Sequence, residues 1–328
     1  MNRENTNQTK ASPNIVAVIP CYRETGHVLK VIKHIGPEVS KIVVVDDGCP
    51  ENTGDLVEKK CPDKRTHILR HSNNLGVGAA TITGYQKALA LGADIIVKID
   101  GDGQMDPKLI PNLIRPIIEG NADYVKGNRF HRLDAIYCMP LLRIIGNTFL
   151  SFLTKVSSGY WSIFDPTNGF TAIHGKIAKI LPFHHIAKGY FFETDMLFRL
   201  GTLKAVVKDM PMQAIYSNET SHLRISRILS EFLIGHLKNS VKRIFISYFL
   251  TDFTLASVEL VLSILLYSFG LFFGIPRWFE SIDTGIPATA GEVILAALPI
   301  ILGTQLLIAF LNYDFRKTPK NPIHPSLH

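Results

Sequence analysis

Two aspartates, Asp100 and Asp102, stand at the end of an apolar run in the stretch VKIDGDGQMDP. Such a carboxylate pair is typical of a calcium loop, of a Mg²⁺ or Mn²⁺ site for a phosphorylated substrate, or of an ordinary polar turn. The calcium loop is excluded, because its sixth and twelfth positions, counted from Asp100, are Met105 and Pro111 instead of glycine and glutamate. A divalent cation at this place, with Gln104 as a further oxygen ligand, would neutralise the diphosphate of a departing nucleotide.

Polar residues also follow other apolar runs in this part of the chain. Buried strands are predicted in the segments NIVAVIPCYRE, KIVVVDDG, THILRH, DIIVKIDGD and ADYVKGNR, and helices over residues 28–35, 77–92 and 107–120. Asp106, directly before the last helix, is predicted to cap it. Short apolar runs that alternate with helices indicate an α/β domain with a mostly parallel sheet. Ligands gather at the carboxyl ends of such strands, so these polar residues predict one shared site.

The stretch NNLGVGAA also contains the spacing GxG, which occurs in dinucleotide-binding folds. In those folds the glycines follow the first strand and read GxGxxG. Here the first strand runs into PCYRE, and Thr81 stands at the position of the third glycine. The dinucleotide fold is therefore excluded.

Composition narrows the classes of protein and of site. Of the 328 residues 46% are hydrophobic, and the net charge is +7. A basic chain suits nucleic acid, an anionic membrane surface or phosphorylated substrates, so the position of the charges has to decide. Four cysteines without CxxC spacing favour free thiols over disulfides or a zinc site. The histidines of LPFHHIAKGY favour a solvated loop, and the polar residues 1–13 predict a disordered lead without a signal segment.

The chain changes character after about residue 222. Residues 223–250 predict basic amphipathic helices of the kind that lies in a membrane interface. Residues 251–315 contain two apolar stretches, about 253–275 and 293–312, each long enough to span a membrane. The loop between them is acidic, and basic residues flank the pair on both sides, so the positive-inside rule places the α/β domain and the 316–328 tail in the cytoplasm. This predicts a multi-pass protein of the inner membrane.

Five blocks, VIPCYRE, VVVDDG, NNLGVGAA, IDGDGQ and KGNR, occur in this order at predicted strand ends. In this set the chain resembles the family 2 glycosyltransferases with the GT-A fold. It is most similar to their polyprenyl-phosphate branch, typified by dolichol-phosphate mannose synthase and the bacterial undecaprenyl-phosphate sugar transferases. The resemblance covers roughly residues 14–222, and the blocks FDPTNGF and GYFFETDML are also similar to that branch. It implies an inverting membrane enzyme that moves a sugar from a nucleotide-diphosphate sugar to polyprenyl phosphate, with Mg²⁺ or Mn²⁺ as cofactor.

The resemblance also implies a donor site. The residues that match the family's nucleotide-binding motifs are Pro20, Tyr22, Glu24, Asp46, Asp47, Asn74, Gly76, Asp100 and Asp102. Among them Asp46, with Asp47 beside it, matches the acid that hydrogen-bonds the base. Asp102, Gln104 and Asp100 match the family's metal site. Within it Asp102 and Gln104 are the favoured ligands, and Asp100 faces the nucleotide.

An acceptor site is implied as well. Arg129 and Arg143 match positions near the sugar phosphate or the acceptor phosphate, and arginine suits bidentate phosphate binding, although surface arginines are the alternative. Ser221 matches one position of the family block Arg-x-x-Gly-x-Ser-Lys. His222 replaces the lysine of that block and its arginine is missing, a gap that His222 or Arg224 would have to fill.

Three acids are candidates for a catalytic base: Asp195, Glu193 and Asp165. A hydroxyl acceptor needs a base, whereas a phosphate acceptor is already anionic at pH 7. In the second case the pair of acids in FFETDM orders the acceptor loop instead. Two rival functions follow: transfer to a sugar hydroxyl of a lipid-linked glycan, and a non-catalytic, nucleotide-sugar-binding membrane scaffold. The resemblance favours UDP slightly over GDP, implies a homo-oligomer, a tetramer, and gives no role to nucleic acid.

Overall fold

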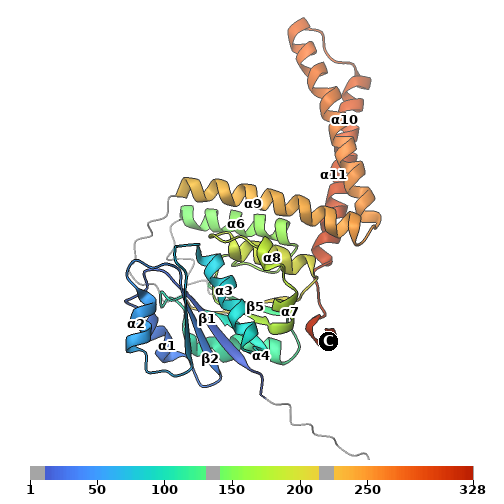
Figure 1. Ribbon diagram of the computed structural model, residues 1–328. Helices are drawn as coiled ribbons and strands as arrows, with labels where there is room; N and C mark the ends of the chain where they lie inside the picture. Colours follow the sequence, from blue (N-terminus) through green and yellow to red (C-terminus); the bar gives the residue numbers. More distant parts are fainter. Residues whose placement is uncertain (1–11, 131–140, 214–224, 328) are drawn as a thin grey trace, which may run out of the picture. The chain divides into compact units, whose positions relative to one another are not determined.

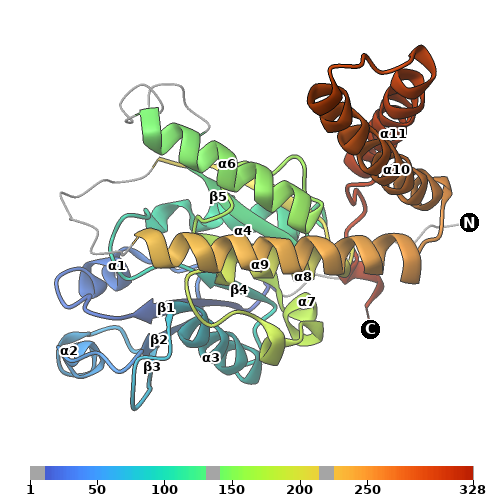
Figure 2. The ribbon, with the colours of Figure 1, turned by 90° about the horizontal axis from the view of Figure 1, so that it is seen from above.

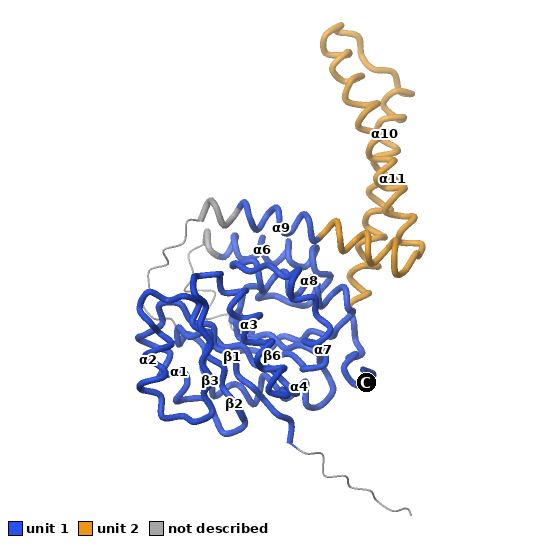
Figure 3. The backbone as a smooth tube through the Cα atoms, in the orientation of Figure 1, with its two compact units in different colours: residues 1–239, 319–328 blue, residues 240–318 orange. Residues whose placement is uncertain are grey.

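The computed structural model describes residues 12–130, 141–213 and 225–327. The chain forms two compact units (Figure 3). The first comprises the residues up to Asn239 together with 319–328, and the second comprises 240–318. The catalytic motifs predicted from the sequence all fall in the first unit.

A single sheet forms the centre of the first unit (Figure 1). Its strands are β1 (Ile15–Cys21), β2 (Lys41–Asp46), β3 (Thr66–Arg70), β4 (Ile95–Lys98), β5 (Tyr124–Asn128), β6 (Thr171–His174) and β7 (Val207–Pro211). They are arranged in the order β3-β2-β1-β4-β6-β5-β7. β6 runs antiparallel to β4 and β5, and the other pairs are parallel. This confirms the predicted α/β class with a mostly parallel sheet.

Helices cover both faces of this sheet. Alternate residues of β1 show why: Ile15, Ala17 and Ile19 point into one hydrophobic core, and Val16 and Val18 into the other. The first core is completed by α1 (Val28–His34), α2 (Thr53–Lys60) and α4 (Ile110–Ile118). The second is completed by α3 (Val77–Ala90), α7 (Gly175–Ile180) and α8 (Phe192–Thr202). Burial on both faces explains why the central strands are apolar at every position.

The predicted elements lie close to the observed ones. The first five strands and helices α1, α3 and α4 occupy the expected segments, and Asp106 accepts a hydrogen bond from the Lys108 amide, as a cap should. α2, α6 (Leu141–Ser158), α7, α8, β6 and β7 are not predicted from the sequence. β6 has four residues and β7 carries Lys208 and Asp209, so neither shows the apolar run that marks the central strands.

The C-terminal part contains α9 (Ile225–Phe245), a π-helical turn (Ile246–Leu250), α10 (Leu255–Thr284) and α11 (Ala290–Arg316). α10 and α11 are long and apolar enough to cross a membrane, by length and composition. They pack against each other as a hairpin, and each extends beyond the predicted span. In this second unit Arg243 forms a two-pronged ion pair with Asp314, and the Tyr248 hydroxyl donates to the same carboxylate at 2.6 Å.

Residues 319–327, part of the predicted cytoplasmic tail 316–328, pack on the rest of the first unit. The carboxylate of Asp123 is fully buried and accepts hydrogen bonds from the amides of Ile323 and His324. It also accepts one from the Val206 amide at 2.7 Å. The ring of His324 stacks on that of His174 with 4.2 Å between centroids. Ile323 and Leu327 thus pack against the second hydrophobic core of the first unit.

Candidate active site

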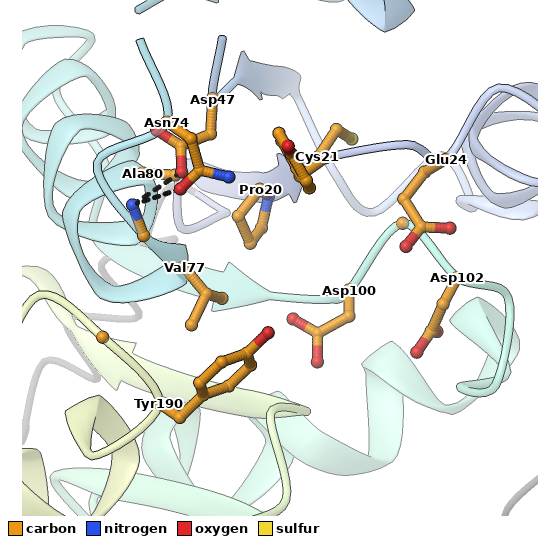
Figure 4. Close-up of a pocket in the computed structure, with 14 residues that line it drawn as sticks. Pro20, Cys21, Glu24, Asp47, Asn74, Val77, Ala80, Asp100, Asp102 and Tyr190 are labelled. Atoms are coloured by element: carbon orange, nitrogen blue, oxygen red, sulfur yellow. Dashed lines mark hydrogen bonds between the residues drawn. The ribbon is translucent and has the colours of Figure 1, made fainter. Parts of the chain in front are cut away.

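A pocket of about 320 Å³ opens where β1, β2 and β4 end (Figure 4). The expected nucleotide-binding residues that line it are Pro20, Tyr22, Glu24, Asp47, Asn74, Gly76, Asp100 and Asp102. Asn74 and Gly76 come from the loop after β3, so the loops after four neighbouring strands, β3, β2, β1 and β4, meet at one site. This is the arrangement that parallel strands produce at their carboxyl edge.

Asp46, expected to bind the base, is turned away from this pocket. One carboxylate oxygen accepts from the Cys49 amide at 2.8 Å, and the other accepts from the Gly54 amide at 2.6 Å. The side chain is buried and is engaged with the backbone at the start of α2. Its neighbour Asp47 lines the pocket instead.

Asp47 holds the loop that contains the NNLG stretch. Its carboxylate accepts from the amides of Leu75 at 3.0 Å and Gly76 at 2.8 Å, and it lies 2.6 Å from Nδ1 of His71. Gly76 has a φ of +98°, and a Cβ there would lie 2.5 Å from the carbonyl oxygen of Lys188. Glycine is required at this position for both reasons. The loop thereby packs directly against the segment that leads into α8.

Three carboxylates gather at the other side of the pocket. Figure 4 shows Glu24, Asp100 and Asp102 around one part of its wall. Asp102 also accepts from the Gln104 amide at 2.9 Å, which keeps the turn after β4 closed. Among the described residues no group of three or more His, Cys, Asp and Glu is arranged as a ready metal cage.

That donor set nevertheless fits Mg²⁺ or Mn²⁺. These ions take one or two protein carboxylates and fill their remaining positions with water and substrate phosphate oxygens. Asp102 is half-buried at the pocket wall, and its hard oxygen atoms are of the right kind. The excess of negative charge at this wall also favours a cation beside a diphosphate.

The three candidate bases are buried and engaged. Asp195, on α8, accepts from the Ala187 amide and from Nδ2 of Asn239, each at 2.9 Å. Glu193, two residues before Asp195 on α8, lies 2.9 Å from Nζ of Lys98. Neither side chain lines the pocket. Asp195 thus ties the loop before α8 to α9.

Asp165, the third candidate, is paired with Arg129. The guanidinium donates through Nε to one carboxylate oxygen at 2.7 Å and through a terminal nitrogen to the other at 2.9 Å. The Arg129 amide donates to Asp165 as well, at 3.1 Å. Asp165 is fully buried, whereas Arg129 retains 25% of its side-chain exposure. The pair holds the guanidinium in one plane at the end of β5.

The remaining acceptor residues are only partly defined. Arg143 lies in the first turn of α6, and its side chain is not described. Ser221, His222 and Arg224 lie outside the described residues. His184 and His185, expected in a solvated loop, are exposed on a short 3₁₀ turn.

Some pocket residues were not predicted. Cys21, Gly101, Gly189 and Tyr190 also line the pocket. Tyr190 belongs to the block GYFFETDML, whose similarity to the family was the one available signal. Tyr190 is 58% exposed, and Figure 4 shows its hydroxyl group pointing toward Asp100, so its ring can cover a bound ligand.

Comparison with known proteins shows the family of the chain. A family model described as glycosyl transferase family 2 matches residues 16–181. The UDP-N-acetylglucosamine–dolichyl-phosphate N-acetylglucosaminyltransferase of Methanococcus voltae is 32% identical over 67% of this chain and 92% of its own. The undecaprenyl-phosphate mannosyltransferase of Micrococcus luteus is 29% identical over 60% of this chain and 82% of its own.

A solved structure shows the shared fold. The glucosyl-3-phosphoglycerate synthase of Mycobacterium tuberculosis, in complex with Mn²⁺, UDP and phosphoglyceric acid, matches with a TM-score of 0.53 and 19% identity. The match covers 71% of this chain and 79% of that one. The fold and the comparisons thus define the class: a glycosyltransferase with a GT-A-like domain. The chain belongs, more particularly, to glycosyl transferase family 2, as its motifs predict.

Proposed function

We propose that this protein transfers one sugar from a nucleotide-diphosphate sugar to the phosphate of a polyprenyl lipid, with inversion, at the cytoplasmic face of the membrane. The observation that carries the proposal is a donor pocket and an exposed apolar helical surface on the same unit. The relatives from Methanococcus voltae and Micrococcus luteus are named for dolichyl phosphate and undecaprenyl phosphate, which supports the choice of acceptor.

The apolar surface is formed by α6 and α9, which run along the same face of the first unit in both views (Figures 1 and 2). The exposed apolar residues are Ile145, Phe149 and Phe152 on α6, and Leu233, Ile234 and Leu237 on α9. The polar His236 and Asn239 of α9 are buried instead, and His236 bonds Ser157 of α6 at 3.0 Å. A helix that buries polar residues and exposes apolar ones suits a lipid interface.

In the proposed reaction, an oxygen of the acceptor phosphate attacks the anomeric carbon. The bond from that carbon to the nucleotide diphosphate breaks, and the configuration inverts. Asp102 would hold Mg²⁺ or Mn²⁺ at the pocket wall, and Gln104, which the resemblance implies as a second ligand, does not itself line the pocket. The ion would supply positive charge to the departing diphosphate. The neighbouring Mn²⁺ complex supports use of a divalent cation. A phosphate nucleophile needs no base, so catalysis rests mainly on the positioning of the two substrates and on stabilisation of the charge of the leaving group.

The hydrogen bonds of Asp165 and Asp195 support a reaction without a catalytic base. We assign Arg129 to the acceptor phosphate, and Asp165 to holding the guanidinium in place for it. We assign Asp195 to ordering the loop that carries Tyr190, the second of the two roles open to it, because both its oxygens already accept hydrogen bonds. UDP is favoured as the donor nucleotide, since the Methanococcus voltae relative is named for a UDP-sugar.

The membrane arrangement completes the proposal. α10 and α11 cross the inner membrane, their acidic connection faces outward, and the first unit lies in the cytoplasm. A tetramer stays a prediction from the family resemblance.

The test is a screen of UDP- and GDP-sugars against undecaprenyl phosphate with the full-length protein in detergent, with Mg²⁺ or Mn²⁺. We expect a sugar-lipid product from one donor and none without the divalent cation. Failure of every pair, with a folded protein, would refute the proposed acceptor. Transfer to a lipid-linked glycan hydroxyl would instead support the rival function.

A further inference from the structure

Lys98 is a buried lysine that contacts Asp100, one of the residues that line the pocket. It is the last residue of β4, two residues before Asp100, and only 1% of its side chain is exposed. A lysine is rarely buried to this extent unless its ammonium group is paired. Nothing in the proposed reaction uses Lys98 directly.

The Lys98 ammonium is shared between two carboxylates. Nζ lies 2.7 Å from Oδ1 of Asp100 and 2.9 Å from Oε1 of Glu193, and it donates to the carbonyl of Gly169 at 3.3 Å. Burial lowers the pKa of Lys98, but the two carboxylates together raise it above the ordinary lysine value, so the ammonium stays charged. Its three donors are therefore matched by three acceptors.

Gly169 shows how closely this group is packed. A Cβ at that position would lie 2.2 Å from Oδ2 of Asp100 and 2.6 Å from Nζ of Lys98. Any side chain at residue 169 would push the ion pair out of place. The glycine of the FDPTNGF block therefore leaves the space in which Lys98 and Asp100 meet.

We infer that Lys98 is a positioning residue of the donor site: it fixes the Asp100 carboxylate toward the nucleotide and ties the end of β4 to α8. Asp100 is the partner that lines the pocket, whereas Glu193 belongs to α8, the helix that follows the Tyr190 loop. The Lys98 ammonium group thereby fixes the end of β4, with Asp100, relative to α8 and the Tyr190 loop before it. The inference rests on the proposed function only in taking the pocket as the site of a nucleotide.

The test measures binding of UDP and GDP with Mn²⁺ to the full-length protein by calorimetry, without an acceptor. Lys98→Met should weaken the nucleotide that the wild type binds by about tenfold or more, the effect of one lost hydrogen bond between charged groups. Lys126→Met is the matched control. Lys126 is also fully buried in the sheet, on β5, but its ammonium donates to the Asn168 carbonyl. The Lys126→Met variant should be less stable than the wild type but should bind the nucleotide with the same affinity.

A double-variant cycle separates positioning from general stability. If Lys98 acts through Asp100, then adding Lys98→Met to Asp100→Asn should change the affinity by no more than about twofold. Full additivity of the two substitutions would overturn the inference, as would unchanged affinity in Lys98→Met or an equal loss in Lys126→Met.

Gly169→Ala provides a second route if Lys98→Met does not fold. Both charges remain in that variant but are displaced, so nucleotide affinity should again fall by about tenfold. Gly84→Ala is its control, because a Cβ there would press on Val18, within the core behind the sheet. Wild-type affinity in Gly169→Ala would overturn the inference. Since no acceptor is present, nucleotide binding without sugar transfer would refute the proposed function and leave this test intact.

Discussion

At the scale of single residues, neighbouring carboxylates have different roles, one in the pocket and one as a helix cap. Asp102 stands at the pocket wall, and Asp106, four residues further on, caps the next helical turn. We expect Asp102→Asn to lower the rate of sugar transfer by about 100-fold, since it removes a ligand of the cation that stabilises the leaving group. Asp106→Ala should cost about 1 kcal/mol of stability and leave the rate nearly unchanged. Initial rates and thermal unfolding of both variants check this.

The Arg129–Asp165 pair gives a second prediction. Asp165→Asn keeps the shape of the side chain but loses the two-pronged ion pair that orients the guanidinium. We expect KM for the lipid phosphate to rise by about tenfold, while KM for the nucleotide sugar stays within about twofold. Steady-state kinetics with each substrate varied in turn measure both values. A rise confined to the nucleotide sugar would show that the pair serves the donor side.

The contacts of individual acidic residues could not be predicted from the sequence. The motif VVVDDG offered two adjacent acids for the base, and only the structure shows that the amides of Cys49 and Gly54 engage Asp46. Adjacent residues of a strand end point in opposite directions, and which one faces the ligand depends on the register of the sheet. The engagement of Asp195 and Asp165 likewise depends on partners distant in sequence.

At the scale of elements, the apolar face of α9 carries a prediction. Leu237 is 67% exposed, which water would not favour but a lipid interface would. We expect Leu237→Glu to reduce transfer to undecaprenyl phosphate in membranes by several-fold, with nucleotide binding unchanged. Lys238→Gln, at the next exposed position, is the control. Transfer in reconstituted vesicles measures the effect, and full activity of Leu237→Glu would contradict an interfacial role for this face.

Continuous apolar runs predicted the elements that carry apolar residues on every side. The central strands and the two long C-terminal helices have apolar runs that the sequence displays directly. α6 was missed although it has exposed phenylalanines, because its apolar residues serve an outer surface and not the core. β6 was missed because it is short and enters the sheet in the antiparallel sense, an arrangement that local sequence does not specify.

At the scale of the whole molecule, residues 319–327 are held on the first unit by Asp123 and by the stacked rings of His174 and His324. Burial, with smaller contributions from His324 and Lys176, lowers the pKa of His174 from 6.5 to about 4. The unfolded chain therefore takes up a proton at His174 below about pH 6.5, and the folded protein does not until about pH 4. The free energy of unfolding therefore decreases as the pH is lowered from about 6.5 to about 4.

We expect the melting temperature to drop between pH 6.5 and pH 4, and His174→Asn to lessen the drop. Asparagine can keep the hydrogen bond that Nδ1 of His174 accepts from the Lys176 amide at the start of α7. The buried His236, whose pKa is also lowered to about 4 by burial, contributes the same trend and remains in the variant. Thermal unfolding at several pH values measures how steeply the melting temperature of the wild type and of the variant depends on pH. A variant that loses stability as steeply as the wild type would contradict the role of His174.

The central claim is that the acceptor is a phosphate presented at a membrane. Its most direct test offers the full-length protein one active UDP- or GDP-sugar with undecaprenyl phosphate or with undecaprenol, and identifies the lipid product by mass spectrometry. We predict one added sugar on undecaprenyl phosphate, inverted configuration at the anomeric carbon, and no product from the alcohol. Equal transfer to the alcohol, or transfer only to the hydroxyl of a lipid-linked glycan, would contradict it.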